Sequence, residues 1–170
     1  MIGKIKSLRE LFEIELGYAY DCEKKLAEKG LPTMIESASS TDLRMALEDH
    51  WRETQEHVAR LEHVFSIIGV EPNTKSNDII DKMTSAVKDS VSNIESSPLR
   101  DAALIVNGNL AEHYEIATYG SLAAFARSLG LTEVGSLLAK ILDQEKKADA
   151  KLSQIGEKVL NPQAARHRSA

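Results

Sequence analysis

Apolar residues recur at intervals of three and four over most of the chain, which is the spacing that gives a helix one buried face. Four long stretches carry this pattern, at about 4–29, 39–68, 97–128 and 132–160. A shorter stretch at 78–94 repeats it between the second and the third. Period-two alternation, the pattern of a half-buried strand, is absent from the sequence. The pattern therefore predicts four long helices, one shorter helix and no strand.

The expected helix ends depend on capping residues, glycine and proline. Gly30 is expected to take the left-handed conformation that ends the first helix, and Pro32 to prevent its continuation. A short helical turn is expected over "TMIESAS", and the polar run "SSTD" should cap the second long helix. Ser97 is expected as the N-cap of the third long helix, with Pro98 at its first helical position, and Thr132 as the N-cap of the last.

The order of these elements indicates the fold class. Two long helices are followed by a long connection that contains the shorter helix, and then by two more long helices. This is the connectivity of a ferritin-like four-helix bundle rather than of a simple up-down-up-down bundle. We therefore predict an all-α, ferritin-like bundle whose long crossover contains an extra short helix. The chain has 170 residues, and we expect a single domain over residues 1–160 and a flexible tail over 161–170.

Composition and charge exclude several classes of protein. The formal net charge is −5 and the basic residues form no large cluster, so nucleic acid is not an expected partner. A single cysteine, Cys22, allows no internal disulfide and no cysteine-rich metal site. The amino-terminal segment is charged throughout and no long apolar run occurs, so we expect neither a secretory signal nor a membrane span. A cytoplasmic location is the resulting expectation.

Carboxylates and imidazoles occupy positions on the apolar stripes where a buried residue is expected. Each long helix carries at least one near its middle. They are Glu23 in the first helix, His50, Glu53 and His57 in the second, Glu112 and Glu115 in the third, and Glu145 and Asp149 in the last. A lone glutamate on such a stripe usually reaches solvent or pairs with a basic residue. Four helices with such residues at the same height require another explanation.

Bound metal ions are the simplest explanation for these groups. Several unpaired carboxylates in one core would cost several kcal/mol each, and the stripes contain no Lys or Arg to neutralise them. Carboxylate together with imidazole suits iron, manganese or zinc better than calcium. The known di-iron arrangement uses a Glu-x-x-His pair on two of its helices, which this chain lacks in that form. We therefore predict a carboxylate-rich centre of two metal ions, with iron as the first candidate.

Four further residues lie near these positions. Tyr119, two turns from Glu112, is the best candidate for a contact with the centre, although tyrosines in bundles more often serve packing. Trp51 is expected to point away from the metal face, toward a subunit interface. His113 is expected at the periphery of the centre or at an interface, and Cys22 as a small buried side chain.

Four segments, "CEKKL", "HWRETQEHVARLE", "RDAALI" and "EHYEIATYGSLA", resemble the YciE/YciF-type family of bacterial ferritin-like proteins. The resemblance extends from about Leu8 to Leu152, and "EHYEIATYG" is its most specific piece. It implies a ferritin-like bundle, often a homodimer, that is linked to stress responses and has no established reaction. It also implies a two-metal centre. The family's acidic positions fall on Glu23, Glu112, Glu115 and Glu145, and its histidine position falls on His50. Members often have Gln where this chain has Glu53 and His57.

Two hypotheses of function from different classes follow. In the first, the two metals handle oxygen, peroxide or iron, with Glu53 and Glu145, or a glutamate of the third long helix, as bridging ligands and His50 and His57 as terminal ligands. No residue can be named as a catalytic acid or base, so no reaction is assigned. In the second, the metals only stabilise a structural or stress-response protein. Iron storage in a cage is a weaker third hypothesis, because no extra carboxy-terminal helix is expected.

Overall fold

The computed structural model describes residues 4–72 and 75–166, and within them the secondary structure is entirely helical. Four long helices form the bundle: α1 (Leu8–Lys25), α3 (Thr41–Ile68), α5 (Ser97–Ser128) and α6 (Thr132–Ile155). Three shorter helices are α2 (Leu31–Ser37), α4 (Asp78–Asn93) and α7 (Asn161–Arg166), and two π-helical segments span Leu26–Gly30 and Gly156–Leu160. This confirms the predicted all-α bundle.

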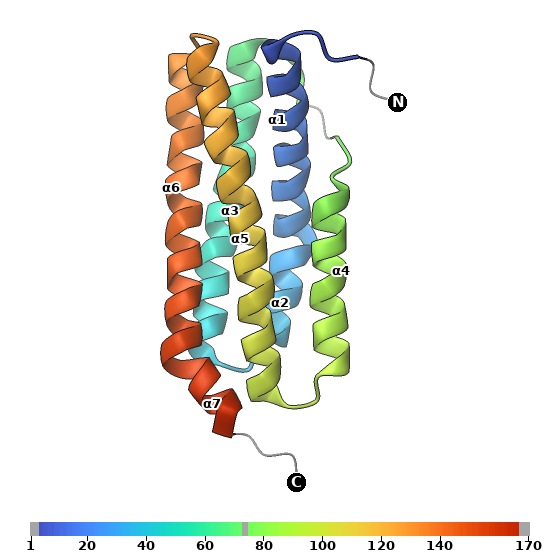
Figure 1. Ribbon diagram of the computed structural model, residues 1–170, viewed down its shortest axis with the longest axis vertical. Helices are drawn as coiled ribbons and strands as arrows, with labels where there is room; N and C mark the ends of the chain where they lie inside the picture. The colour runs from blue at the N-terminus through green and yellow to red at the C-terminus, as the bar shows by residue number, and fades with distance from the viewer. Residues whose placement is uncertain (1–3, 73–74, 167–170) are drawn as a thin grey trace.

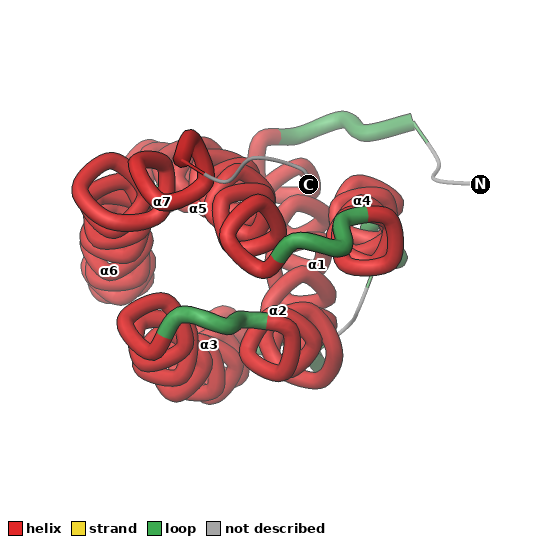
Figure 2. The backbone as a smooth tube through the Cα atoms, turned by 90° about the horizontal axis from the view of Figure 1, so that it is seen from below, coloured by secondary structure: helices red, strands yellow, loops and turns green. Residues whose placement is uncertain are grey.

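The long helices run in two directions, as Figure 1 shows: α1 and α6 run one way, and α3 and α5 the other. The long connection between α3 and α5 contains α4, which lies outside the bundle against α1, α2 and α5 (Figure 2). The predicted crossover with an extra helix is therefore confirmed. None of the helices in the described ranges combines the length and apolar character that a membrane span requires.

A buried asparagine fixes the start of the crossover helix. The side-chain oxygen of Asn77 accepts hydrogen bonds from the first backbone N–H groups of α4, as an N-cap does. Its amide nitrogen donates to the carbonyl of Tyr18 at 3.1 Å and to the hydroxyl of Tyr114 at 2.8 Å. Its backbone N–H donates to Asp21 at 2.8 Å. Asn77 thus caps the first turn of α4 and anchors this helix to α1 and α5.

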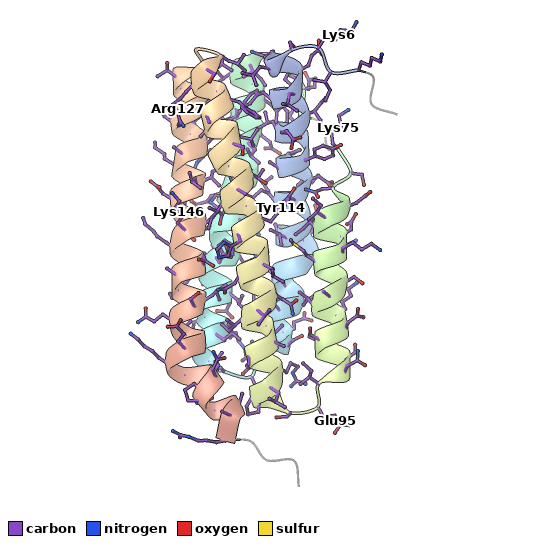
Figure 3. The ribbon with its side chains drawn as sticks, viewed as in Figure 1. Lys6, Lys75, Glu95, Tyr114, Arg127 and Lys146 are labelled. Carbon is purple, nitrogen blue, oxygen red and sulfur yellow. The ribbon has the colours of Figure 1, made fainter. Side chains whose placement is uncertain are left out.

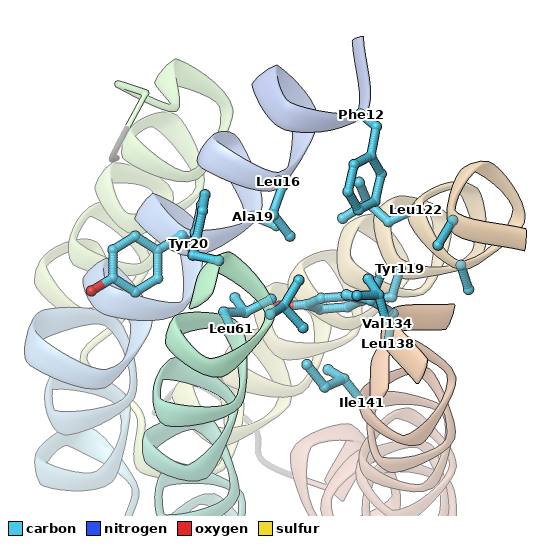
Figure 4. Close-up of a cluster of buried hydrophobic side chains, with 14 residues drawn as sticks. Phe12, Leu16, Ala19, Tyr20, Leu61, Tyr119, Leu122, Val134, Leu138 and Ile141 are labelled. Carbon is cyan, nitrogen blue, oxygen red and sulfur yellow. The ribbon is translucent and has the colours of Figure 1, made fainter. Parts of the chain in front are cut away.

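Two apolar clusters fill the interior of the bundle. The cluster near the α1 start comprises fourteen buried residues of the four long helices and is drawn in Figure 4, where Phe12, Leu61, Leu122 and Leu138 are among those labelled. The other cluster lies toward α2 and the crossover helix and includes Leu104. Each large apolar side chain removed from water contributes about 1.5–3 kcal/mol. Charged side chains such as Arg127 and Lys146 lie on the outside (Figure 3).

Several predicted helix ends differ by a few residues from the observed ones. Helix α1 starts at Leu8 rather than near residue 4, because the Ser7 hydroxyl accepts the N–H of Glu10 and caps the helix there. Ser96 rather than Ser97 is the N-cap residue of α5, so that Pro98 is in its second helical position. Thr132 is the first residue of α6 and not its cap.

The predicted helix end at Gly30 is wrong. Gly30 has φ −60°, and the chain remains helical through Pro32 into α2. The π-helical segment explains this, because in it a backbone N–H bonds to the carbonyl five residues earlier. Pro32 has no N–H, so the carbonyl of Ala27 is left without its backbone donor. The indole N–H of Trp51 donates to that carbonyl at 2.8 Å. Trp51 is thus a half-buried structural partner of this turn.

The predicted end of the last helix near Leu160 is also wrong. The second π-helical segment is followed by α7, with Pro162 in its second position, just as Pro32 follows the first segment. Ala164 is buried, so packing holds this turn in place. Residues 161–166 of the expected tail are therefore folded, and residues 167–170 lie outside the described residues.

Candidate metal centre

Six polar side chains from all four long helices meet between the two apolar clusters. All six residues are buried, with at most 6% of their surface exposed. They are Glu23 from α1, His50 and His57 from α3, Glu112 and Glu115 from α5, and Glu145 from α6. All six were candidate ligands from the sequence.

Helical periodicity places these side chains inside the bundle. Glu23 follows the buried Leu16 by seven residues, which is close to two helical turns. Glu112 lies midway between the buried Ile105 and Tyr119, seven residues from each. The apolar residues that bury the stripe therefore also force these carboxylates toward the bundle axis.

The six residues form two groups that share Glu145. In the first, ligand atoms of His50, Glu112, Glu115 and Glu145 all lie within 4.8 Å of one another. The Nε2 atom of His50 is 3.1 Å from Glu112 Oε1 and 3.9 Å from Glu145 Oε2. Three carboxylates and one imidazole therefore surround one point.

The second group comprises Glu23, His57 and Glu145, with ligand atoms again within 4.8 Å of one another. The Nδ1 atom of His57 is 3.0 Å from Glu145 Oε1 and 3.4 Å from Glu23 Oε1. The two oxygens of Glu145 thus face different groups: Oε2 faces the histidine of the first, and Oε1 the histidine of the second.

The polar atoms of this layer are close together but poorly satisfied. In the described part of the chain, seven of them are buried without a hydrogen-bond partner: Glu23 Oε2, His50 Nδ1, His57 Nδ1, Glu112 Oε2, Glu115 Oε2 and both oxygens of Glu145. A buried polar group without a partner costs on the order of 1–3 kcal/mol, and more when it is charged. Their donor types, oxygen and imidazole nitrogen, fit iron, manganese or zinc.

Neighbouring side chains orient the second group. The hydroxyl of Tyr119 donates a hydrogen bond to Glu23 Oε1, so the expected contact of Tyr119 with the cluster is present. The Nε2 atom of His57 lies 3.3 Å from Gln144 Oε1, which also accepts a hydrogen bond of 2.8 Å from Arg60. Outer partners of this kind fix the tautomer and direction of a ligating imidazole.

Sequence reasoning did not select Gln144 and Arg60. Gln144 directly precedes Glu145, and Arg60 follows His57 by three residues on the same helix. Their closeness in sequence to Glu145 and His57 was the one feature that could have indicated them. The hydrogen bonds that Gln144 makes with His57 and Arg60 depend on how α3 and α6 pack against each other. On the first group, the Cys22 thiol lies 4.0 Å from Glu115 Oε1, so this buried side chain contacts the cluster as well.

Burial and the contacts among its side chains raise the pKa values of the first group. Burial raises the pKa of Glu112 to about 8, although the nearby His50 opposes this shift. Burial also raises the pKa of Glu115 well above its usual range. Burial disfavours a charged His50, yet the surrounding carboxylates, Glu112 first, outweigh it and raise its pKa to about 9.

The pKa values of His57 and Glu23 in the second group are raised as well. Burial opposes the charge on His57, but the nearby carboxylates of Glu145 and Glu23 outweigh it and raise its pKa to about 10. Burial raises the pKa of Glu23, against the effect of His57. Without bound metal, the layer therefore retains protons on imidazoles and on part of its carboxylates.

Two predicted ligands lie outside both groups. The side chain of Glu53 is 43% exposed, and its Oε2 lies 3.8 Å from His50 Nδ1. Asp149 lies one turn beyond Glu145, where its Oδ1 is 3.4 Å from Nε2 of the mostly exposed His113. Glu53 lies between His50 and His57 along α3, but about 60° round the helix from His50, at the exposed edge of the buried stripe. Asp149 lies on α6 one turn, roughly 5.4 Å, from Glu145 along the axis.

A surface pocket of about 400 Å³ lies between α3 and α6 and reaches His50. Its other lining residues include Glu53 and Ala148. The first group therefore adjoins a space open to solvent, whereas His57 and Glu23 of the second group have no exposed side-chain surface.

Comparison with known proteins agrees with the motifs. A family model described as "Domain of unknown function (DUF892)" matches residues 7–165. Protein YciF of Escherichia coli strain K12 is 30% identical over 164 residues, which cover 94% of this chain and 96% of YciF.

Solved structures show the same architecture. The crystal structure of the E. coli stress protein YciF matches with a TM-score of 0.88 at 28% identity, over 92% of this chain and 99% of that one. YcfI of Rhodopseudomonas palustris, for which a structural role has been suggested, matches with a TM-score of 0.87 at 34% identity, over 90% and 97%. The resemblance noted in the sequence is thereby confirmed, and the chain belongs to the DUF892 family of YciF-like proteins.

Proposed function

We propose that this protein binds two metal ions in the buried polar layer, one in each group, with Glu145 contributing to both. The observation that carries the proposal is the set of seven unpartnered polar atoms in the two groups. Pairs such as His57 and Glu145 lie 3.0 Å apart, yet neither His57 Nδ1 nor the Glu145 oxygens make a hydrogen bond. Donor atoms that converge without bonding one another are suited to a shared cation.

The donor set favours iron, with manganese or zinc as alternatives. Four carboxylates and two imidazoles supply hard oxygen and intermediate nitrogen donors, which these metals accept and which calcium uses less well. The carboxylates would neutralise two divalent ions almost completely, so the layer would no longer carry excess charge in a dry core.

A bound pair of iron or manganese ions, though not of zinc, would supply two-electron redox chemistry toward a small oxidant such as oxygen or peroxide. The chain contributes the environment for this chemistry. The apolar clusters exclude water, Tyr119 orients Glu23, and Gln144 orients His57. The pocket at His50 gives small molecules access to the first group. The proposed role is therefore the handling of oxygen, peroxide or iron, which would suit a relative of a stress protein.

A non-catalytic role is the alternative. In that case the metals only neutralise the buried carboxylates and hold the four helices together. The complete burial of Glu23 and His57 favours this reading for the second group, and YcfI, with its suggested structural role, shares the fold. Turnover separates the two roles, because a purely structural centre would not be oxidised and reduced repeatedly.

The test begins with elemental analysis of protein purified without a histidine tag, beside the Glu23→Ala/Glu145→Ala double variant. We expect two metal ions per chain in the parent protein and fewer than one in the variant. The metal-loaded protein is then reduced, and its absorption is followed during addition of oxygen or peroxide. Repeated oxidation supports oxygen handling, an inert centre supports the structural role, and no metal uptake refutes the proposal.

The homodimer implied by the family resemblance stays a prediction. Leu99, Val106 and Leu110 lie on one face of α5 and are 43%, 60% and 53% exposed. A second copy of the chain would bury this apolar stripe, so Val106→Glu/Leu110→Glu should shift the mass measured by light scattering from dimer to monomer. A monomeric parent protein would contradict the prediction.

A further inference from the structure

The pocket between α3 and α6 ends at the metal centre. Its lining includes two small residues, Ala46 of α3 and Ala148 of α6, whose side chains fill little of the space between the helices. Its lining includes His50, whose side chain is only 7% exposed. The imidazole therefore stands between a solvent-filled depression and the first group.

The two nitrogens of His50 face opposite environments. Nε2 lies 3.1 Å from Glu112 inside the centre, and Nδ1 lies 3.8 Å from Glu53 at the pocket. Nδ1 is buried and has no hydrogen-bond partner in the described chain. A buried donor atom that faces a pocket and has no partner is suited to a ligand that arrives through that pocket.

The charges around the pocket leave two carboxylates available. Asp49 pairs with Arg52 at 2.8 Å and with Lys151 at 3.5 Å, so one carboxylate engages two of the three basic groups. Among the described residues, neither Glu53 nor Glu56 forms an ion pair with a lysine or arginine, and Lys147 pairs with no carboxylate. Glu53, the carboxylate beside His50, is therefore not neutralised by a lysine or arginine.

We propose that this pocket is the entrance through which divalent cations reach the centre, with Glu53 as the capturing carboxylate. The proposal rests on the proposed two-metal function. Because Glu53 is 43% exposed, a cation held there keeps much of its water and is bound weakly, as transfer onward requires. Glu53 lies beside His50, which in turn contacts Glu112 and Glu145, so carboxylate and imidazole donors lead inward without a gap.

This role has a kinetic signature that a resident ligand lacks. A residue on the route lowers the barrier for passage in both directions, so its removal slows uptake and release by the same factor. The affinity and the number of bound ions then stay the same. Removal of a resident ligand weakens the affinity instead.

The experiment measures Co²⁺ uptake by the metal-free protein in a stopped-flow spectrometer, through the visible absorption of the bound ion. For Glu53→Gln we expect uptake and chelator-driven release to slow together, by roughly three- to tenfold, because the carboxylate no longer stabilises a cation that crosses the pocket in either direction. Glu53→Lys should slow uptake further, and Glu53→Asp should restore part of the rate. Glu133→Gln, which removes the same charge from the exposed start of α6, is the matched control and should keep the parent rate.

Each other result overturns the proposal in a recognisable way. Equal uptake rates for Glu53→Gln and the parent protein would exclude this pocket as the entrance. Fewer bound ions in Glu53→Gln, or a larger dissociation constant, would make Glu53 a resident ligand, as the sequence first indicated. A parent protein that binds no Co²⁺, Fe²⁺ or Mn²⁺ would refute the two-metal function itself, and the entrance with it.

Discussion

The two groups of the candidate centre share Glu145 but differ in their enclosure. The first adjoins a pocket of about 400 Å³ through His50, and a half-exposed carboxylate, Glu53, stands at its outer side. In the second, the side chains of Glu23 and His57 have no exposed surface. Similar donors thus occupy an accessible and an enclosed position within one layer.

The neighbouring side chains account for this difference. Tyr119 belongs to the apolar cluster above the layer and closes the second group with its hydrogen bond to Glu23. On the other side, Ala46 and Ala148 leave a space next to the first group. Access in a four-helix bundle is therefore set by the size of the side chains that separate the helices, and not by the ligands themselves.

Loss of the shared carboxylate should have the largest effect. Glu145→Ala removes a donor from both groups at once, so we expect metal content to fall from two ions per chain to less than one. Elemental analysis after dialysis measures this. Asp149→Ala is the matched control, because this carboxylate lies one turn away and outside both groups. Equal metal loss in the two variants would contradict the sharing of Glu145.

Loss of a ligand from only one group should separate the two positions. Glu23→Ala should retain one ion, held by the accessible group, and that ion should exchange with labelled metal within minutes. Glu112→Ala should also retain one ion, held by the enclosed group, and its exchange should be at least about tenfold slower, since the side chains of Glu23 and His57 have no exposed surface. Similar exchange rates in the two variants would show that enclosure does not differ between the groups.

Removal of the Tyr119 hydroxyl should weaken the enclosed group alone. Tyr119→Phe keeps the ring in the apolar cluster and loses the hydrogen bond to Glu23. Loss of such an orienting partner costs roughly ten- to a hundredfold in metal affinity. Calorimetric titration should therefore show one weakened and one unchanged binding event. Two unchanged events would mean that Tyr119 serves packing only.

The metal-free protein should lose stability as the pH rises. Folding raises the pKa of Glu112 from 4.5 to about 8 and those of His50 and His57 from 6.5 to about 9 and 10, so the folded state binds these protons more tightly. Stability from such groups is complete below their unfolded pKa values and is lost as the pH rises toward the folded ones. Between pH 6 and 9 we expect the free energy of unfolding to fall by at least about 2 kcal/mol, which lowers Tm by at least roughly 4 °C.

Bound metal should reverse this trend, because it takes the place of the protons. Thermal unfolding with and without a chelator measures both effects, and the stabilisation by metal should grow with pH. A metal-free protein whose Tm rises between pH 6 and 9 would contradict the assigned protonation.

Residue spacing alone predicted the four long helices and the inward position of six of the eight candidate ligands. A carboxylate on an apolar stripe has to face the core whenever the stripe does, so Glu23 and Glu145 were predictable without knowledge of helix packing. Glu53 lies between His50 and His57 along α3 but at the edge of the buried stripe, where its side chain is 43% exposed, and Asp149 lies one turn beyond Glu145 on α6. Which edge of a stripe and which turn face the centre depend on how the helices pack, and residue spacing does not encode that.

The helix ends at Gly30 and Leu160 could not be predicted in the same way. Both lie in π-helical segments, each of which precedes a proline. A proline normally ends a helix, because the carbonyl behind it loses its donor. At the first segment Trp51 supplies that donor from another helix. The same dependence on tertiary contacts hid the role of Gln144, whose partner His57 lies on α3.

Anomalous X-ray diffraction from crystals of the iron- or manganese-loaded protein would locate the bound metal ions. We expect two anomalous peaks per chain, one on each side of the Glu145 carboxylate, with His50 at the first and His57 at the second. Peaks confined to surface carboxylates, or no peak in the buried layer after loading, would contradict the proposed two-metal centre.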